Sequence, residues 1–232
     1  MRGRTKERGL SLVEVLITLA IVSLITGFAM FGAGAASGAR LRRSATLVSA
    51  AVRVAYAHAN AISKPVRLVF DLDERTVGIE ESSGDISVKR NDKTGGAAAA
   101  TEAEKKAIEE ADAILKGPRP SRPTFKPTQA FGFNPEKGRA GKELEKGIRF
   151  LQIEVDHQDE PSKQGRAYLY FWPGGQTERA AIQLRVDGSD SEKDMLTVLV
   201  SPLTGKAELK RGRVSMPKPR DETEASERRD GF

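Results

Sequence analysis

An uncharged stretch of 25 residues, 15–39, constrains this chain more than any other feature of its sequence. A helix rises about 1.5 Å per residue and roughly 20 residues span a bilayer, so this stretch is long enough to cross one. A basic segment, residues 1–9, precedes it and ends in Gly9. The carboxylate nearest to the stretch is Glu14, and a carboxylate at a membrane helix costs free energy unless it has a partner. The sequence therefore predicts a transmembrane helix over residues 10–39 with one acidic side chain that needs a partner.

Cleavage after Gly9 would create that partner, because the new α-amine of Leu10 is positively charged and lies about one helical turn from Glu14. It could pair with Glu14 of the same chain or of a neighbouring molecule. Residues 9–16 consist of Gly9, a bulky apolar residue and then Ser-Leu-Val-Glu-Val-Leu. This string resembles the class III signal of type IV prepilins and type II secretion pseudopilins.

The resemblance implies a role for each of these residues. A prepilin peptidase would cut after Gly9 and N-methylate Leu10, and Glu14, the fifth mature residue, would guide assembly into a helical filament. The family usually has Phe at the first mature position. Leu10 departs from that pattern, but it is another bulky apolar residue and we expect it to be accepted.

Two other interpretations of the N-terminus remain open. An ordinary secretory signal peptide could be cleaved at the small residues Ala33-Gly34-Ala35, although its apolar core would be long for such a peptide. An uncleaved signal anchor is the other. Neither interpretation gives Glu14 a role.

Charge and cysteine content limit the compartment and the chemistry. The formal net charge is +6, but residues 1–9 hold four basic residues against one acidic residue, so the mature chain carries only about +3. A basic leader next to an apolar helix predicts that residues 1–9 stay in the cytoplasm and that the rest of the chain faces outward. Together with the resemblance, this orientation implies a single-pass protein of the inner membrane with its C-terminal domain in the periplasm. The sequence contains no cysteine, which excludes disulfides, thiol catalysis and Cys-ligated metals.

The remaining sequence predicts an α+β fold in which a long N-terminal helix packs on an antiparallel sheet. Residues 40–64 repeat apolar side chains every three or four positions and continue the helix up to Pro65. Residues 65–81 alternate as two strands joined by a turn, and residues 129–210 predict an antiparallel meander with one face free to cover the helix. Residues 82–128 predict an irregular, partly disordered insertion with one short helix after Thr101, and residues 211–232 a disordered tail.

Three segments also resemble the GspH/FimT branch of the pseudopilins. They are Phe-Trp-Pro-Gly-Gly at residues 171–175, Ala-Ile-Gln-Leu at 181–184, and Val-Ser-Pro-Leu-Thr-Gly-Lys at 200–206. The resemblance implies the type IV pilin-like fold and a minor subunit of a filament.

The sequence gives little support to catalysis or cofactor binding. His58 and His157 are predicted at the surface without metal-ligand spacing, and there is no Gly-x-Ser-x-Gly or phosphate-binding loop. No cofactor is expected. An acidic turn is a weak calcium candidate, although a solvated hairpin fits better; its carboxylates are Asp187, Asp190, Glu192 and Asp194.

Nucleic-acid binding is not expected either, although basic residues gather near the C-terminus. Five acidic residues follow them and weaken their field. The basic residues are Lys206, Lys210, Arg211, Arg213, Lys218 and Arg220.

These observations and resemblances lead to one hypothesis and two alternatives. We expect a non-enzymatic minor pseudopilin of a type II secretion system, which helps move folded proteins across the outer membrane. Its expected partners are other pseudopilins, a prepilin peptidase and an inner-membrane assembly platform. The first alternative is a FimT-like minor type IV pilin for pilus assembly, adhesion or DNA uptake. The second is a signal-anchored periplasmic binding or hydrolytic domain.

Overall fold

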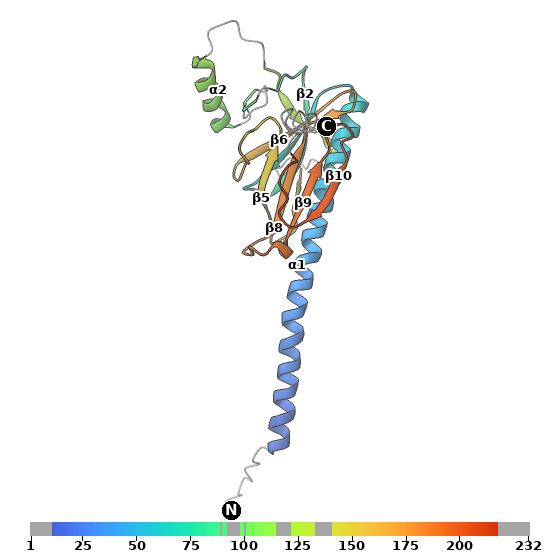
Figure 1. Cartoon of the computed structure of the whole chain (residues 1–232), viewed down its shortest axis with the longest axis vertical. Coiled ribbons are helices and arrows are strands. Elements are labelled where there is room, and N and C mark those ends of the chain that lie inside the picture. The colour runs from blue at the N-terminus through green and yellow to red at the C-terminus, as the bar shows by residue number, and fades with distance from the viewer. Residues whose placement is uncertain are drawn as a thin grey trace, which may run out of the picture. The chain divides into compact units, whose positions relative to one another are not determined.

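The computed structural model describes residues 11–88, 90–91, 98–99, 101–114, 122–132 and 141–217, without the side chains of 28–35, 111–114 and 131. The chain forms two compact units, Met1–Ala39 and Arg40–Phe232. Helix α1 (Leu12–Ile62) contributes to both, and the second unit also holds all of the strands (Figure 1). The fold is α+β, as the sequence predicts.

The second part of α1 buries one face against the sheets. Its fully buried residues recur every three or four positions and most are small, which lets the helix backbone approach the strands closely. The helix ends at Ile62, and Ser63 takes a left-handed conformation (φ 54°) two residues before Pro65. The predicted amphipathic helix is therefore confirmed; the buried residues of this face are Leu41, Ala45, Val48, Ala51, Val52, Ala55 and Ala59.

The strands form two antiparallel sheets. The first sheet has the order β3-β2-β1-β6-β7, with β4 also paired to β2, and the second has the order β10-β9-β8-β5. The first consists of β1 (Val66–Asp71), β2 (Thr76–Ser82), β3 (Phe125–Pro127), β4 (Lys142–Glu143), β6 (Arg166–Trp172) and β7 (Gln176–Thr177). The second consists of β5 (Ile148–Val155), β8 (Ala180–Val186), β9 (Met195–Val200) and β10 (Ala207–Arg211). The shorter helices are α2 (Glu102–Ile114), η1 (Gln129–Phe131) and η3 (Glu192–Asp194).

The single meander predicted over residues 129–210 is wrong, because β6 and β7 belong to the first sheet. Strand β6 pairs with β1 along its whole length, from Val66 opposite Phe171 to Asp71 opposite Arg166. Only β8, β9 and β10 follow one another as a meander, and β5 joins them through β8. Alternation along β6 indicates a strand but does not select its neighbour.

Strand β5 contains one irregularity. The apolar pattern of residues 148–156 changes face after Phe150, and the pairing of β5 with β8 shifts its register between Phe150 and Gln152. The extra residue is a β-bulge, which restores the apolar side of β5 to the core.

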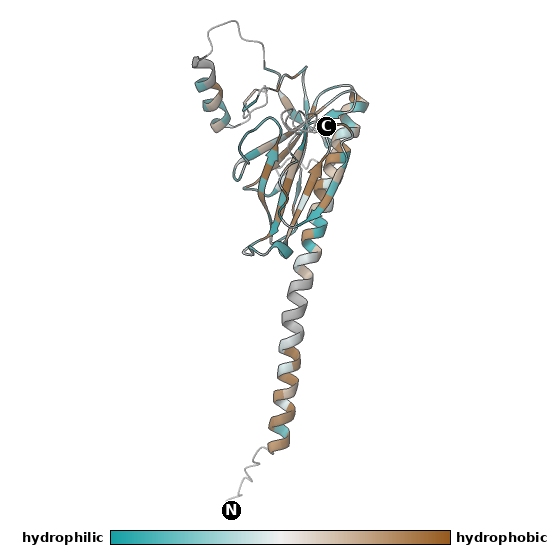
Figure 2. Ribbon diagram, in the orientation of Figure 1, coloured by the Kyte–Doolittle hydropathy of each residue, from teal (hydrophilic) through white to brown (hydrophobic). Residues whose placement is uncertain are grey.

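The main core lies between the second part of α1 and the inner faces of both sheets. Inward-facing residues of β1, β2 and β6 and of β5, β8 and β9 join the small helix residues in one buried cluster. Figure 2 shows this as hydrophobic colour on the strands and hydrophilic colour on many of the turns. Phe70 and Phe150 connect the two sheets within it, with ring centroids 5.8 Å apart at 76°.

Described residues of the predicted insertion, 82–128, cover the outer face of the first sheet. Tyr168 and Tyr170 point away from α1 yet are fully buried, because residues of this segment pack over them. Phe125 belongs to β3, which pairs with β2, so this part of the segment is regular rather than irregular. The short helix after Thr101 is confirmed as α2, and Thr101 and Glu104 exchange the two hydrogen bonds of a capping box.

The predicted disorder of the tail is wrong for its first residues. Arg211 ends β10, and residues 212–216 then cross the outer face of the second sheet. They hydrogen-bond to polar side chains of neighbouring strands. Gly212 C=O accepts from Thr197 Oγ1 (2.8 Å), and Val214 C=O accepts from Gln183 Nε2 (3.0 Å). Arg213 donates to Gln152 Oε1 (3.0 Å). These hydrogen bonds satisfy polar groups that would otherwise be buried without partners.

The turn between β9 and β10 contains a position, Gly205, that only glycine occupies without strain and a clash. Gly205 has φ +59°, and a Cβ there would lie 2.3 Å from the ring of Tyr56 on α1. Gly188 has φ +75°, but a Cβ there would meet nothing within 4 Å. Gly188→Ala should therefore cost only the left-handed strain of alanine, about 1 kcal/mol. Gly205→Ala should cost a further ~1–3 kcal/mol from overpacking.

Chemical denaturation of the two variants, followed by Trp172 fluorescence, measures both costs. Equal losses would show that the contact between Tyr56 and this turn does not constrain the fold.

Candidate functional site

The first part of α1 presents an apolar surface that nothing in its own unit covers. Its large hydrophobic side chains are between 42% and 77% exposed, on every side of the helix. Figure 2 shows this end of α1 as largely hydrophobic. A patch of this kind marks a surface that contacts a partner or a membrane. The residues are Leu12, Val13, Val15, Leu16, Ile17, Leu19, Ile21, Val22, Leu24 and Ile25.

Glu14 lies in the first turn of α1, at the edge of this surface. Its carboxylate is exposed and makes no hydrogen bond or ion pair within the described part of the chain. The backbone N–H groups of Glu14 and Val15 donate to Ser11 C=O at 3.0 and 3.1 Å and begin the helix. Ser11 and Glu14 also have the spacing of a capping box, as Thr101 and Glu104 do at the start of α2.

The two predicted processing residues, Gly9 and Leu10, lie outside the described residues, as does the whole of the predicted leader, residues 1–9. Over the residues that are described, no helix meets the length and apolarity needed to cross a membrane.

The outer face of the first sheet holds a buried ionic cluster. Arg67 pairs with Glu80, with Nη2 2.7 Å from Oε2, and its guanidinium lies between the rings of Phe125 (4.1 Å) and Tyr168 (4.0 Å). The Tyr168 hydroxyl donates a hydrogen bond to the Glu104 carboxylate of α2. Burial alone would lower the pKa of Arg67, but the Glu80 carboxylate and the hydroxyls of Tyr170 and Tyr168 together outweigh this effect, and the pKa is raised. The cluster joins β1, β2, β3, β6 and α2, and its buried charges are paired, so it serves the fold.

Burial of Tyr168 raises the pKa of its phenol well above the ordinary value, and the hydrogen bond to Glu104 adds to this effect. The phenol therefore stays protonated and remains a donor. The contact fixes the capping residue of α2 to the covered face of the sheet.

The two histidines are both paired with carboxylates. His58 Nε2 on α1 donates to Glu81 on β2 at 2.7 Å. Hydrogen bonds from Thr128 and then from His58 lower the pKa of Glu81. The stabilisation from these contacts is therefore present at neutral pH and is lost as the pH falls through that lowered pKa.

His157 corrects the prediction of two surface histidines. It is 6% exposed, and its Nδ1 lies 2.9 and 3.0 Å from the oxygens of Glu178. A carboxylate only accepts, so Nδ1 carries the proton. The ring also packs edge-on against Tyr170, with centroids 5.5 Å apart. Alternation and charge gave no signal for this pair, because its burial depends on strands that are distant in sequence.

The acidic turn does not gather its carboxylates around one point. Asp187 pairs with Arg149 (3.0 Å), Asp190 with Arg185 (2.7 Å), and Asp194 accepts from the Ser189 hydroxyl (2.7 Å). Glu192 begins η3. Across the residues described, no group of three or more acidic, histidine or cysteine side chains could hold a metal ion. The weak calcium candidate gains no geometric support.

The basic C-terminal residues are partly engaged within the chain. Lys210 pairs with Glu208 at 2.6 Å, and Arg213 binds Gln152 on the second sheet. Lys218 and Arg220 lie outside the described residues. The expectation that this region does not bind nucleic acid stays a prediction.

Comparison with known proteins gives one match. The family model of the prokaryotic N-terminal methylation motif matches residues 4–30, which contain Gly9, Leu10 and Glu14. No curated protein and no solved structure matches the chain. The motif implies processing by a prepilin peptidase and assembly with pilin-type proteins, and it suggests anchoring in the inner membrane. The chain thus carries the N-terminal methylation motif of type IV prepilin-like proteins on an α+β fold consistent with that of pilins.

Proposed function

We propose that this chain is a minor pseudopilin of a type II secretion system, resembling GspH, and that it acts mechanically rather than as an enzyme. The observation that carries the proposal is the methylation motif placed at the start of an exposed apolar helix. A prepilin peptidase cleaves after Gly9 and methylates Leu10. The helix then anchors the chain in the inner membrane, with the sheets in the periplasm, until an assembly platform moves it into a short filament.

The apolar surface of α1 supports the assembly step. Exposing ten large hydrophobic side chains within residues 12–25 to water is unfavourable in free energy. Either lipid or neighbouring helices therefore bury them. Transfer between these two apolar environments costs little hydrophobic free energy. The filament core then has one expensive feature, the charge of Glu14, which must be neutralised there. The amine of Leu10 on a neighbouring subunit supplies the opposite charge.

The two-sheet unit supports a role in presenting a surface rather than in chemistry. Within the described residues its paired carboxylates and histidines form structural ion pairs, as Arg67 with Glu80 and His157 with Glu178 illustrate. We propose that this unit contacts other pseudopilins or exported proteins. The GspH-like assignment itself derives from the sequence resemblance in strands β6, β8 and β9 and the turn that follows β9.

The mass of the N-terminal peptide of the mature chain, isolated from its native cells, tests the processing step. We expect a chain that begins at Leu10 and carries one N-methyl group. A chain that begins at Ala36 or at Met1 would contradict the proposal. Those two results would favour, respectively, a secretory signal peptide and an uncleaved anchor.

Deletion of the gene tests which filament the chain joins. We expect folded exoproteins to accumulate in the periplasm, and the wild-type chain to restore their secretion. Normal secretion combined with loss of surface pili or DNA uptake would instead assign the chain to a type IV pilus. Both results keep the motif's role and separate the secretion hypothesis from its first alternative.

A further inference from the structure

A ladder of three aromatic side chains runs along the outer face of β6. Tyr168 and Tyr170 have ring centroids 6.4 Å apart, and Tyr170 and Trp172 are 6.3 Å apart at an interplanar angle of 40°. The first two rings are fully buried beneath the covering segment, whereas Trp172 is only half-buried. The cover therefore stops short of the last ring and leaves part of the indole open.

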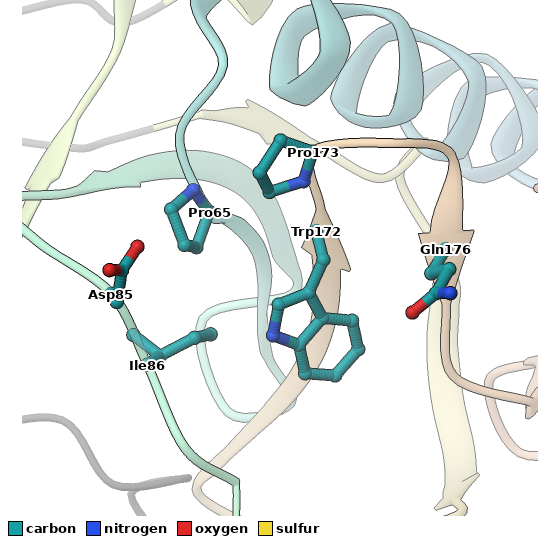
Figure 3. Close-up of a pocket in the computed structure, with 6 residues that line it drawn as sticks. All are labelled: Pro65, Asp85, Ile86, Trp172, Pro173 and Gln176. Atoms are coloured by element: carbon teal, nitrogen blue, oxygen red, sulfur yellow. The ribbon is translucent and has the colours of Figure 1, made fainter.

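A pocket of about 470 Å³ opens beside that indole. It is lined by Pro65, Asp85, Ile86, Trp172, Pro173 and Gln176. Its volume lies in the range of sites that hold small ligands. Figure 3 shows Asp85 and Ile86 on one side of the indole, Gln176 on the other, and the two proline rings next to its base.

The sheet register holds this arrangement in place. Trp172 and Gln176 are directly paired across β6 and β7, so their side chains share one face of the sheet. Val66 pairs with Phe171, which sets Pro65 next to Trp172 in the same row. Contact with Tyr170 fixes the indole from behind, so the platform exists before any ligand arrives.

Three polar groups around the platform have no partner. Within the part of the chain that the structure describes, the indole N–H of Trp172, the amide of Gln176 and the carboxylate of Asp85 make no hydrogen bond or ion pair. Together they offer donors from the indole and the amide, and acceptors from the amide and the carboxylate. A ligand that uses all of them has an apolar face bordered by groups that both donate and accept.

We propose that this pocket binds a neutral carbohydrate, one sugar ring of which stacks on Trp172. The C–H face of a pyranose is apolar and flat enough to lie on an indole. Its hydroxyl groups donate to Asp85 and exchange hydrogen bonds with Gln176, and a ring or hydroxyl oxygen accepts from the indole N–H. This binding activity goes beyond filament assembly and does not depend on it.

Other ligand classes leave part of the site unused. A proline-rich peptide presents carbonyl acceptors to the indole and the amide, but its prolines have no N–H to offer Asp85. An anionic ligand would meet the Asp85 carboxylate, and none of the described residues that line the pocket is basic. A cation would use Trp172 and Asp85 but not the amide donors of Gln176.

The chain provides its own reporter for the test, because Trp172 is its only tryptophan. The full chain in detergent micelles is titrated with chitotetraose, cellotetraose and maltotetraose while tryptophan emission is recorded. A proline-rich peptide that contains arginine is titrated in parallel. We expect a saturable change with at least one oligosaccharide, with a dissociation constant of about 1 mM.

Substitutions connect the signal to the site. Asp85→Ala and Gln176→Ala should each weaken binding about fivefold or more, as expected for the loss of one hydrogen bond. Asp190→Asn is the control, because Asp190 is exposed in the turn that follows β8 of the other sheet, and this variant should bind as the wild type does. Trp172→Ala removes the fluorophore, so its binding is followed by ligand-observed NMR and should be lost.

Three results would overturn the proposal. They are no saturable change with any of the oligosaccharides, equal affinity in the Asp85, Gln176 and Asp190 variants, and saturation by the peptide alone. The last result would show that the pocket recognises a polypeptide. None of these results affects the proposed processing at Gly9, which the N-terminal mass measures separately.

Discussion

Glu14→Ala is expected to leave the two-sheet unit folded and to reduce incorporation of the chain into filaments to background. The side chain lies on α1 within Met1–Ala39, outside the unit that contains the core, so its loss should not alter unfolding of the sheets. In a filament, however, the variant leaves the amine of a neighbouring Leu10 without its counter-charge. An unpaired charge in an apolar core costs about 3–5 kcal/mol, which is enough to exclude the subunit.

Filaments isolated from the periplasm, probed for the chain beside a membrane fraction, measure this effect. The matched variant is Glu14→Gln, which keeps the length and hydrogen-bonding capacity of the side chain but removes its charge. If charge pairing is the role, the glutamine variant fails as the alanine variant does. Normal incorporation of the glutamine variant would show that Glu14 acts locally, through the capping box with Ser11. Normal incorporation of both variants would remove Glu14 from assembly altogether.

Arg67→Ala is expected to lower the free energy of unfolding by about 3–5 kcal/mol. Arg67 is 1% exposed and forms the centre of the ionic cluster on the outer face of the first sheet. Its removal leaves the Glu80 carboxylate buried without a partner, and it also removes the guanidinium that fills the space between Phe125 and Tyr168. The cover over the sheet loses its anchor at the same time.

Two further variants distinguish the buried pair from a general loss of charge. Arg149 pairs with Asp187 at the surface, where both side chains are more than two-fifths exposed, so Arg149→Ala should cost only about 0–1 kcal/mol. The double variant Arg67→Met, Glu80→Leu should recover most of the stability, because apolar groups of similar volume often replace a buried pair at little cost. Denaturant titrations followed by Trp172 emission compare the variants. A loss in Arg67→Ala no larger than in Arg149→Ala would contradict this role.

Elements whose signal is local were predicted well. The turn between β1 and β2, the start of α2 after Thr101 and the end of α1 before Pro65 each depend on residues a few positions apart. Backbone geometry and the periods of 2 and 3.6 residues determine such features within a single segment. The assignment of β6 to a meander failed because an alternating strand fits several neighbours equally well, and packing against residues distant in the sequence selects among them.

The functional residues also differ in whether their signal is local in the sequence. The motif around Gly9 and Glu14 is a contiguous string, so the sequence reveals it without the fold, and the family model matches it alone. The pocket beside Trp172 joins residues 65, 85–86 and 172–176, and its pattern is visible only when β1, β6 and β7 are paired. His157 was predicted at the surface because its partner, Glu178, is 21 residues away.

The sequence by itself therefore determined the long helix, the leader motif and the α+β class, since these follow from composition and period along the chain. Only the tertiary structure decided that Ile86, Val88 and Phe125 cover one sheet, that residues 212–216 cross the other, and that the cover ends before Trp172. The reason is that burial is a property of both partners in a contact. Tyr168 and Tyr170 alternate as solvent-facing residues do, and they are buried because a segment more than 40 residues earlier in the chain packs over them.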